Sequence, residues 1–101
     1  MEKLVKDRKT VYFPVPAVIM SRQDIKYFEK CLYSVVLAMS KLKGYCYSGN
    51  EALAEMLGCG TRHITQGLAK LKEVRLIKTE TKRAGVKVVQ RKIYPLVLMD
   101  K

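Results

Sequence analysis

Acidic residues are scarce in this 101-residue chain, which carries nine Asp and Glu against twenty Lys and Arg, for a formal net charge of +11 at pH 7. A surplus of this size repels itself in a free monomer and is tolerated best when a polyanion is the intended neighbour. A membrane surface also attracts positive charge, but the sequence shows no terminal basic amphipathic helix and no lipidation signal. Nucleic acid is therefore the first candidate partner.

Long apolar runs are missing as well. The longest contain only a few residues, far fewer than a bilayer span requires. The charged segment from Met1 to Lys9 leads into no signal-peptide hydrophobic region. We therefore expect a cytoplasmic protein that does not associate with membranes. Because a chain of this length can bury one modest core, we also expect a single domain over residues 1–101.

Cysteine and histidine are few, and this excludes most chemistry. Cys31, Cys46 and Cys59 are odd in number and widely separated, which suits neither a disulfide framework nor a metal knuckle, so we expect buried or half-buried reduced thiols. His63 has no second histidine beside it, and the sequence offers no recognisable nucleophile, glycine-rich phosphate loop or carboxylate cluster. We expect no catalytic residue, metal or cofactor, and no enzyme.

The first part of the chain predicts a flexible arm, a short extended segment that packs on the body, and a helix. Residues 1–10 are basic and poor in apolar side chains, which predicts a flexible arm. Val11–Phe13 should be extended, and Pro14 and Pro16 should prevent a helix before Ala17. Apolar residues three and four positions apart predict a helix over 24–42, with Ser21 available as its cap. Its apolar surface is wide and, with the apolar end 96–99, suggests a homodimer.

Two further helices follow at close spacing. Tyr45–Tyr47 should be briefly extended, and the segment Ser48–Glu51 resembles a capping box that starts a helix near Gly49. Gly58 is placed as a left-handed residue that ends it. Thr61 can cap a third helix that runs to about Val74.

The last part of the chain changes to an extended pattern. Leu76–Thr81 and Val86–Ile93 are rich in β-branched residues, and the four residues 82–85 between them have turn character. A β-hairpin within residues 75–94 follows from this. The complete pattern predicts an α+β fold that is mostly α, a winged helix-turn-helix of three helices and a β-hairpin wing.

The third helix has the shape that a major groove about 12 Å wide accepts. Ile64, Leu68 and Leu71 form a narrow apolar stripe, and the small residues Gly67 and Ala69 allow close approach to DNA. Arg and Gln side chains are suited to base edges. The predicted contacts from this helix are polar residues outside the stripe: Thr61, Arg62, His63, Thr65, Gln66 and Lys70. An ordinary solvated helix face would have a similar composition, so the interpretation rests on their joint placement.

The wing carries a concentrated charge. From Arg75 to Lys92 there are seven basic residues against Glu80 alone, so +6 of the total +11 lies here. Protecting a β edge from aggregation would need one or two lysines only. We expect the wing to grip phosphates or to enter a minor groove, and to supply more binding energy than the third helix. Its predicted DNA contacts are Lys78, Lys82, Arg83, Lys87 and Arg91.

The run from Ala52 to Ile64, with Leu68, Leu71 and the segment Val74–Ile77, resembles the winged helix-turn-helix domains of bacterial mobile elements. In those domains a Leu-Ala-Glu-x-Leu-Gly helix leads into a recognition helix and a Leu-Ile strand, and a Val-Ser pair is usual where this chain has Cys59-Gly60. The resemblance covers roughly residues 24–94. It implies DNA binding by plasmid or phage proteins that act in replication, partition, conjugative transfer or repression.

Several functions remain open from the sequence. Replication initiators generally carry a second domain, and the sequence ends at Lys101, so we favour an accessory protein that binds double-stranded DNA at an origin as a dimer. Its partners would be an initiator or, in a relaxosome, a relaxase. A small transcriptional repressor and a winged-helix protein-interaction module are the alternatives. Binding only single strands is disfavoured because no row of exposed aromatic residues is evident.

Overall fold

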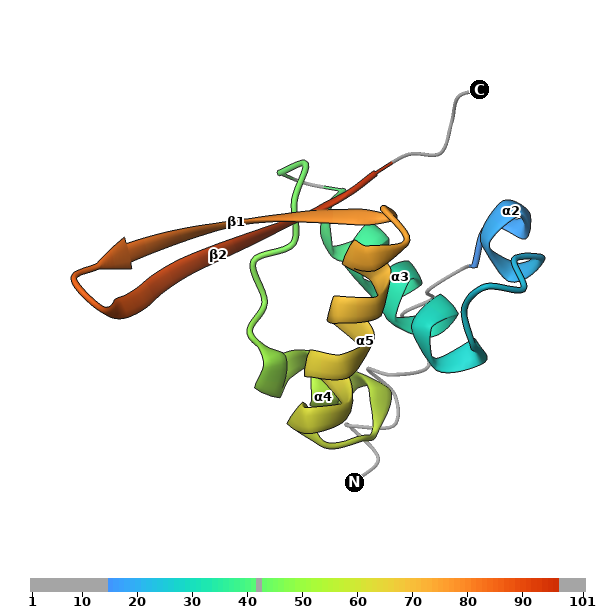
Figure 1. The fold of residues 1–101 in the computed structure, drawn as a ribbon, viewed down its shortest axis with the longest axis horizontal. Coiled ribbons are helices and arrows are strands. Elements are labelled where there is room, and N and C mark those ends of the chain that lie inside the picture. Colours follow the sequence, from blue (N-terminus) through green and yellow to red (C-terminus); the bar gives the residue numbers. More distant parts are fainter. Residues whose placement is uncertain (1–14, 42, 97–101) are drawn as a thin grey trace, which may run out of the picture.

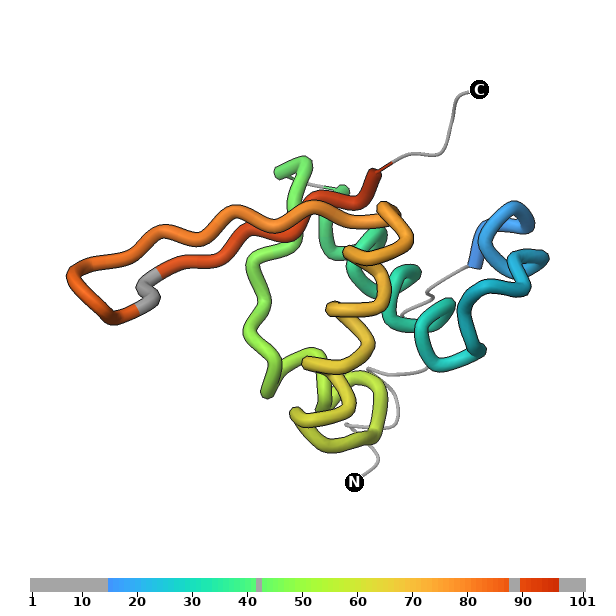
Figure 2. Tube along the Cα trace, viewed as in Figure 1, coloured from blue at the N-terminus to red at the C-terminus, as the bar shows by residue number. Residues whose placement is uncertain are grey.

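A computed structural model describes residues 15–41 and 43–96. The predicted arm 1–10, the extended Val11–Phe13 and residues 97–99 of the apolar end lie outside these ranges. The described residues form four helices and a two-stranded antiparallel sheet (Figures 1 and 2). The elements are α2 (Ala17–Met20), α3 (Tyr27–Met39), α4 (Asn50–Leu57), α5 (Thr61–Glu73), β1 (Ile77–Ala84) and β2 (Lys87–Pro95). The predicted α+β class is confirmed, and the order of elements is compatible with a winged helix.

Helix α3 lies at the centre of the core. Leu32, Tyr33 and Val36 on this helix have no exposed surface, and α2, α4, α5 and β2 all contact it. The Tyr33 hydroxyl donates a hydrogen bond of 2.9 Å to the Leu96 carbonyl oxygen, which anchors the end of the hairpin to the helix. Much of the wide apolar surface that suggested a dimer is therefore covered within the chain. Tyr27 and Cys31 remain exposed, and dimerisation stays a prediction.

The segment before α3 contains a short helix that the sequence did not predict, although the described residues 15 and 16 are non-helical, as expected ahead of Ala17. Helix α2 begins directly after Pro16, which is its N-cap, because a proline ahead of the first turn removes no helical hydrogen bond. Ile19 inserts into the core, and the buried Lys30 of α3 donates from Nζ to the Met20 carbonyl oxygen at 2.5 Å. Ser21 ends α2 and does not cap α3.

The bounds of α3 are narrower than predicted. The helix begins at Tyr27, where the Glu29 carboxylate accepts a 2.6 Å hydrogen bond from the Lys26 backbone N–H. It ends at Met39, and the chain then turns through Gly44, whose φ of 85° lies in the left-handed region. The glycine is suited to this position because such a φ is costly for a residue with a Cβ.

The connection between α4 and α5 is partly as predicted. Gly58 ends α4 in the left-handed conformation with φ 69°, which confirms its predicted role. The capping box at Ser48 is wrong, because Gly49 is the N-cap and no side chain caps α4. Thr61 does not cap α5 either; Gly60 holds that position and Thr61 is the first helical residue.

Helix α5 packs against α3 at very close range. Its predicted stripe is confirmed: Ile64, Leu68 and Leu71 are buried. Gly67 lies between them, and a Cβ on this residue would be 2.7 Å from Leu32 Cδ2 and 2.9 Å from a ring carbon of Phe28. The absence of a side chain at Gly67 therefore permits the approach of α5 to α3. Our expectation that this glycine leaves room for DNA is wrong, because it faces the core.

The hairpin is longer than predicted and its turn is tighter. Residues 82–84 belong to β1, and the turn consists of Gly85 and Val86, with Gly85 at φ 69°. The register shifts at Lys82/Arg83, where β2 contains an irregularity. Cys46 in the predicted extended segment forms an antiparallel bridge with Ile93 through two hydrogen bonds of 2.8 Å. The predicted extended segment 45–47 therefore lies beside β2 and is joined to it by this one bridge, outside the two-stranded sheet.

The thiols differ in environment. All three are free, with Cys46 buried and Cys59 half-buried as expected, whereas Cys31 is exposed, contrary to the prediction. Cys31 belongs to α3, but its side chain lies outside the part of that helix covered by the other elements. No helix within residues 15–41 and 43–96 is long and apolar enough to cross a bilayer.

We predict that Gly67→Ala destabilises the fold. Alanine has a higher helix propensity than glycine, which would stabilise the helix by about 1 kcal/mol. Overpacking a closed core typically costs about 1–3 kcal/mol, however. Leu32 is fully buried, so it cannot shift toward solvent to make room for the added methyl group. The free energy of unfolding in urea should therefore fall. Gln66→Ala on the exposed side of the same helix is the control and should change it by less than about 0.5 kcal/mol. A more stable Gly67→Ala protein would contradict this account.

Candidate nucleic-acid interface

Helix α5 presents a polar face to solvent. Arg62, Thr65, Gln66 and Ala69 follow one another at spacings of three, one and three residues and are all exposed, as is Thr61 in the first turn. They lie opposite the stripe that packs on α3, because helical residues three and four apart share a face. The small Ala69 leaves this face flat beside Arg62 and Gln66. These residues form a surface that can approach a groove without steric obstruction.

Two further predicted contacts on α5, Lys70 and the exposed His63, lie nearer to the α3 side of the helix. The His63 ring stacks on Phe28 with ring centroids 3.9 Å apart and an interplanar angle of 15°, so it extends the contact between α5 and α3. Lys70 is half-buried. Together with a hydrogen bond from Arg22, which is the main cause, its charge helps to lower the pKa of Asp24 to about 2. Both residues therefore lie toward the α3 side of the helix.

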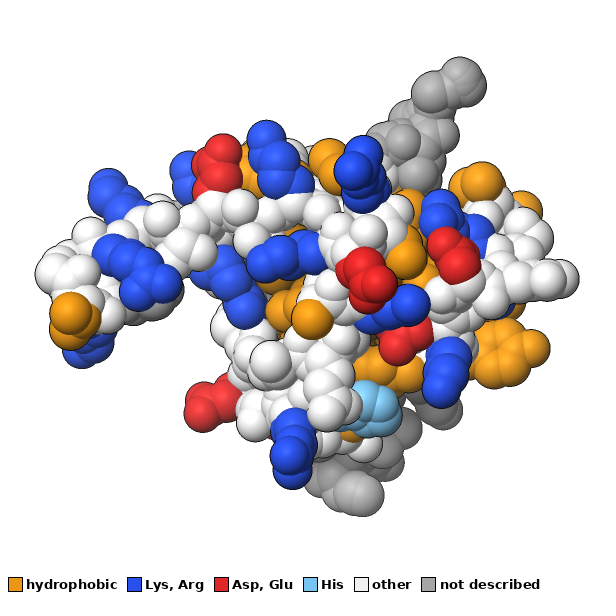
Figure 3. Space-filling view, viewed as in Figure 1, with side chains coloured by type: hydrophobic (Ala, Val, Ile, Leu, Met, Phe, Trp, Pro, Cys, Tyr) orange, Lys and Arg blue, Asp and Glu red, His pale blue; other side chains and the backbone are white. Residues whose placement is uncertain are grey.

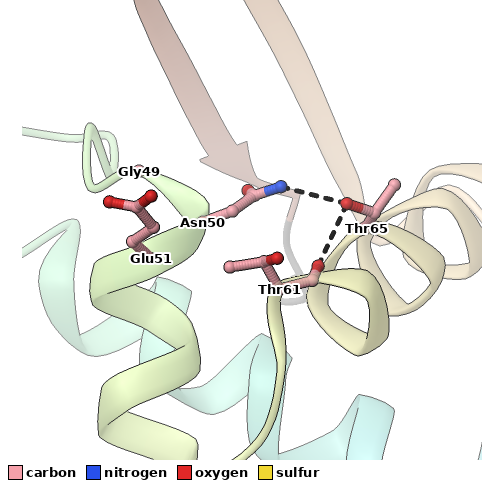
Figure 4. A pocket seen from close by; sticks show the side chains of 5 residues that line it. All are labelled: Gly49, Asn50, Glu51, Thr61 and Thr65. Atoms are coloured by element: carbon pink, nitrogen blue, oxygen red, sulfur yellow. Dashed lines mark hydrogen bonds between the residues drawn. The ribbon is translucent and has the colours of Figure 1, made fainter.

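A polar hollow at the start of α4 was missed by the sequence interpretation. It is lined by Gly49, Asn50, Glu51, Thr61 and Thr65 (Figure 4). Asn50 Nδ2 donates 3.1 Å to Thr65 Oγ1, and that hydroxyl donates 3.1 Å to the Thr61 carbonyl oxygen. The buried Asn50 Oδ1 accepts no hydrogen bond from the described residues. Asn50 thus joins α4 to the exposed face of α5, a contact between distant residues that no local motif signals.

The predicted wing residues divide between the two faces of the hairpin. Alternation along β1 places Arg83 on the face of the buried Ile77, and the pairing of Thr81 with Arg91 places Arg91 there too. Lys78 and Lys82 occupy the opposite face. Lys87 pairs with Ala84, the residue after Arg83, at the end of that opposite face. We call the Arg83 and Arg91 side the inner face and the Lys78 and Lys82 side the outer face.

The inner face is connected to α5 by hydrogen bonds. Arg91 is half-buried, and its Nη2 donates 2.9 Å to the Ser48 carbonyl oxygen. Burial lowers the pKa of Arg91 from its ordinary value, although a guanidinium remains charged at neutral pH. Ser48 is two residues before Asn50, which contacts Thr65. One continuous polar surface is therefore formed by the inner face of the hairpin, segment 48–50 and the exposed face of α5.

Positive charge covers the hairpin along its length. Figure 3 shows Lys and Arg side chains on both edges of the projecting hairpin, with acidic side chains rare among them. Glu80 is the single acidic residue within β1 and β2. Arg62, Lys82, Arg83 and Lys87 are all exposed. Since exposed cations on a projecting arm attract polyanions, the surface has the charge expected for binding nucleic acid.

The geometry offers no metal site among the described residues: no group of three His, Cys, Asp or Glu side chains lies close enough together to hold an ion. The polar groups of the interface are donors and neutral acceptors, with Glu51 at the rim of the hollow in Figure 4. Such an arrangement can form hydrogen bonds and ion pairs with a phosphate backbone and with base edges.

No protein-family model matches the sequence, and no curated protein sequence matches it. Solved structures with a similar fold include the following three. An N-terminal domain of a DNA-binding protein has 18% identity and a TM-score of 0.67, covering 97% of this chain and 83% of that one. The structure of an MDR initiator has 19% identity and a TM-score of 0.63, covering 97% of this chain and 86% of that one. The structure of a Rep–DNA complex has 19% identity and a TM-score of 0.66, covering 97% of this chain and 84% of that one. The likeness establishes a shared fold.

We predict that Arg91 stabilises the fold whereas Lys82 does not. Arg91→Ala removes a charged hydrogen bond to a main-chain oxygen, and the free energy of unfolding should fall by about 1–3 kcal/mol. Lys82→Ala removes an exposed cation and should change it by less than about 0.5 kcal/mol. Chemical denaturation of both variants measures the difference. Equal stabilities would show that Arg91 does not hold the hairpin against segment 48–50.

Proposed function

We propose that this chain is a winged helix-turn-helix protein that binds double-stranded DNA with sequence specificity and catalyses no reaction. The observation that carries the proposal is the continuous surface formed by the exposed side of α5, segment 48–50 and the inner face of the hairpin. It joins base-reading side chains to cations through the Asn50–Thr65 and Arg91–Ser48 hydrogen bonds. Two elements held in this way can contact one duplex at two neighbouring grooves.

Helix α5 supplies the sequence reading in this proposal. Arg62 and Gln66 are exposed four residues apart on one face, and such side chains recognise guanine and adenine edges respectively. Thr65 is held by Asn50 and can contact a base or a phosphate. The helix is free to enter a major groove because its apolar stripe and Gly67 are turned toward α3.

The hairpin supplies most of the affinity. Arg83 and Lys87 flank the turn, and Val86 at its tip is 95% exposed. An apolar residue at the end of a cationic arm has no contact to make within its own fold, but it can enter a minor groove while the neighbouring cations hold phosphates. This arrangement favours the wing as the larger contributor to binding.

The biological setting we favour is an origin of replication. Two of the structurally similar proteins are named as an initiator and as a Rep–DNA complex. In this setting the chain would bind repeated sites as a homodimer beside an initiator; binding at a partition site, or at a transfer origin beside a relaxase, is the related possibility. The repressor and the protein-interaction module remain the alternatives. A footprint on direct repeats supports the origin, whereas protection of an operator overlapping a promoter supports the repressor.

Salt dependence tests the proposal directly. For duplex binding the logarithm of the association constant should fall linearly with the logarithm of salt concentration, by about 0.9 for each phosphate neutralised. Fluorescence anisotropy with a labelled duplex between about 50 and 200 mM salt, a range over which such losses are large, gives the slope. An absent or flat dependence would favour the protein-interaction module.

We also predict that wing and helix substitutions differ in kind. Arg83→Ala and Lys87→Ala should weaken binding to all duplexes and each lower the salt slope by about 1. Gln66→Ala should leave the slope unchanged and relax the preference for one base by about 1–3 kcal/mol. Lys26→Ala, at the exposed N-cap of α3 and outside the proposed duplex surface, is the control. Loss of binding in Gln66→Ala alone would reverse the ranking of wing and helix.

A further inference from the structure

Tyr45 and Tyr47 meet Tyr94, which is far from them in the sequence, on the outer face of the sheet. Cys46 pairs with Ile93 and points into the core, so its neighbours Tyr45 and Tyr47 point the other way. Tyr94 follows Ile93 and lies on the same side. The Tyr45 ring centroid is 5.7 Å from that of Tyr94 and 6.2 Å from that of Tyr47. The result is a row of three aromatic rings across segment 45–47 and β2.

Each ring of this row has a lysine beside it. Lys43 Nζ lies 4.7 Å from the Tyr47 centroid, Lys92 Nζ 4.8 Å from Tyr45, and Lys78 Nζ 5.3 Å from Tyr94. Tyr47 is 57% exposed, and Tyr45 and Tyr94 are half-buried. We call these six residues the tyrosine–lysine row. The row lies on the face opposite to Arg83 and Arg91, so the proposed duplex surface does not use it.

From this geometry we propose that the tyrosine–lysine row binds single-stranded nucleic acid. Rings that present a face to solvent stack unpaired bases, and nearby cations attract the backbone phosphates; this pairing of aromatic and basic groups is how proteins bind single strands without strict sequence preference. The sequence gives no sign of the row because its members lie at 43–47, 78 and 92–94, brought together by the Cys46–Ile93 bridge.

The angles between the rings favour a single strand over a duplex. The planes of Tyr45 and Tyr94 are inclined by 57°, and those of Tyr45 and Tyr47 by 63°. Both centroid separations exceed the rise of about 3.4 Å between stacked bases. A continuous stack therefore cannot lie across the row, and each ring would accept one separated base. Bases can separate in this way in a single strand but not within an intact duplex.

The remaining charges of the outer face are compatible with a polyanion. Glu80, the single acidic residue of β1 and β2, accepts a 3.2 Å hydrogen bond from the Tyr94 hydroxyl and pairs across the sheet with Lys92. Burial and the Glu80 charge raise the pKa of Tyr94, so its phenol stays protonated and uncharged. Lys43 and Lys78 are exposed and Lys92 is half-buried. Because a lysine stem is flexible, an ammonium that rests over a ring can move to a phosphate when a base takes its place.

The proposal is independent of duplex binding by α5 and the wing. A protein that binds both would hold a duplex on the inner face and the tip of the hairpin, and an unpaired strand on the outer face at its base. An acidic protein partner would be attracted by the lysines but would give no reason for three adjacent aromatic rings.

The test uses the full chain and labelled single-stranded probes, oligo(dT) and oligo(U), measured by fluorescence anisotropy at fixed salt. Tyr47→Ala should weaken binding about tenfold, which is within the range for loss of one stacked base. Tyr47→Phe keeps the ring and should bind within about twofold of the original protein. Tyr27→Ala is a matched control: Tyr27 is 74% exposed with Lys30 Nζ 5.0 Å from its centroid, but it lies on α3. Because both tyrosines are exposed, neither substitution should prevent folding, and thermal melts check this.

The outcomes separate the two proposals. Selective loss in Tyr47→Ala with either probe supports the row, and the tighter probe identifies DNA or RNA as the ligand. Equal affinities of Tyr47→Ala and Tyr27→Ala, no binding of either probe, or displacement of the probe by poly(glutamate) as readily as by unlabelled oligo(dT) would overturn it. A Tyr47→Ala protein that also loses duplex binding would assign the row to the duplex surface and overturn it as well. Single-strand binding without duplex binding would instead reject the function proposed above.

Discussion

The close packing of α5 on α3 is the constraint on which the rest of the structure depends. Gly67 lets the two helices approach until a Cβ there would lie 2.7 Å from Leu32, and Ile64, Leu68 and Leu71 close the contact around it. A narrow buried seam of this kind leaves most of the circumference of α5 in solvent. The polar face with Arg62 and Gln66 is a consequence, since a helix with a wider apolar contact would have fewer positions free for recognition.

The attachment of the hairpin decides how its charges are used. The Cys46–Ile93 bridge and the Tyr33–Leu96 hydrogen bond hold the base of the hairpin on the body, and the rest of it projects (Figure 1). Concentrating positive charge on a projecting arm keeps much of it away from the core, where repulsion between cations would oppose folding. With the base fixed, strand alternation assigns each side chain to one of two faces.

The two faces of the hairpin differ in chemistry. The inner face carries arginines, and one of them already bonds the main chain at Ser48, which suits the planar guanidinium with its several donors. The outer face carries lysines over tyrosine rings. Lysine is a compact, mobile cation, and a ring beside it adds an apolar surface without fixing the ammonium. One strand pair thus supplies two basic surfaces with different binding properties, and both depend on the same register.

Local patterns in the sequence were sufficient for the α+β class, the stripe of α5, the glycine stop at Gly58 and the concentration of charge in the hairpin, because each depends on neighbours within a few residues along the chain. The cap assignments at Ser48 and Thr61 failed because a glycine occupied each N-cap position instead. Only the tertiary structure decided four other features. These are the direction in which Gly67 faces, the contact of Asn50 with Thr65, the division of arginines and lysines between the two faces of the hairpin, and the meeting of Tyr45, Tyr47 and Tyr94. The contacts of Gly67, Asn50 and Tyr94 join segments fifteen or more positions apart in the sequence. The faces of the arginines and lysines depend on the register of the hairpin, which pairs Thr81 with Arg91. Neither composition nor local periodicity specifies this packing and register.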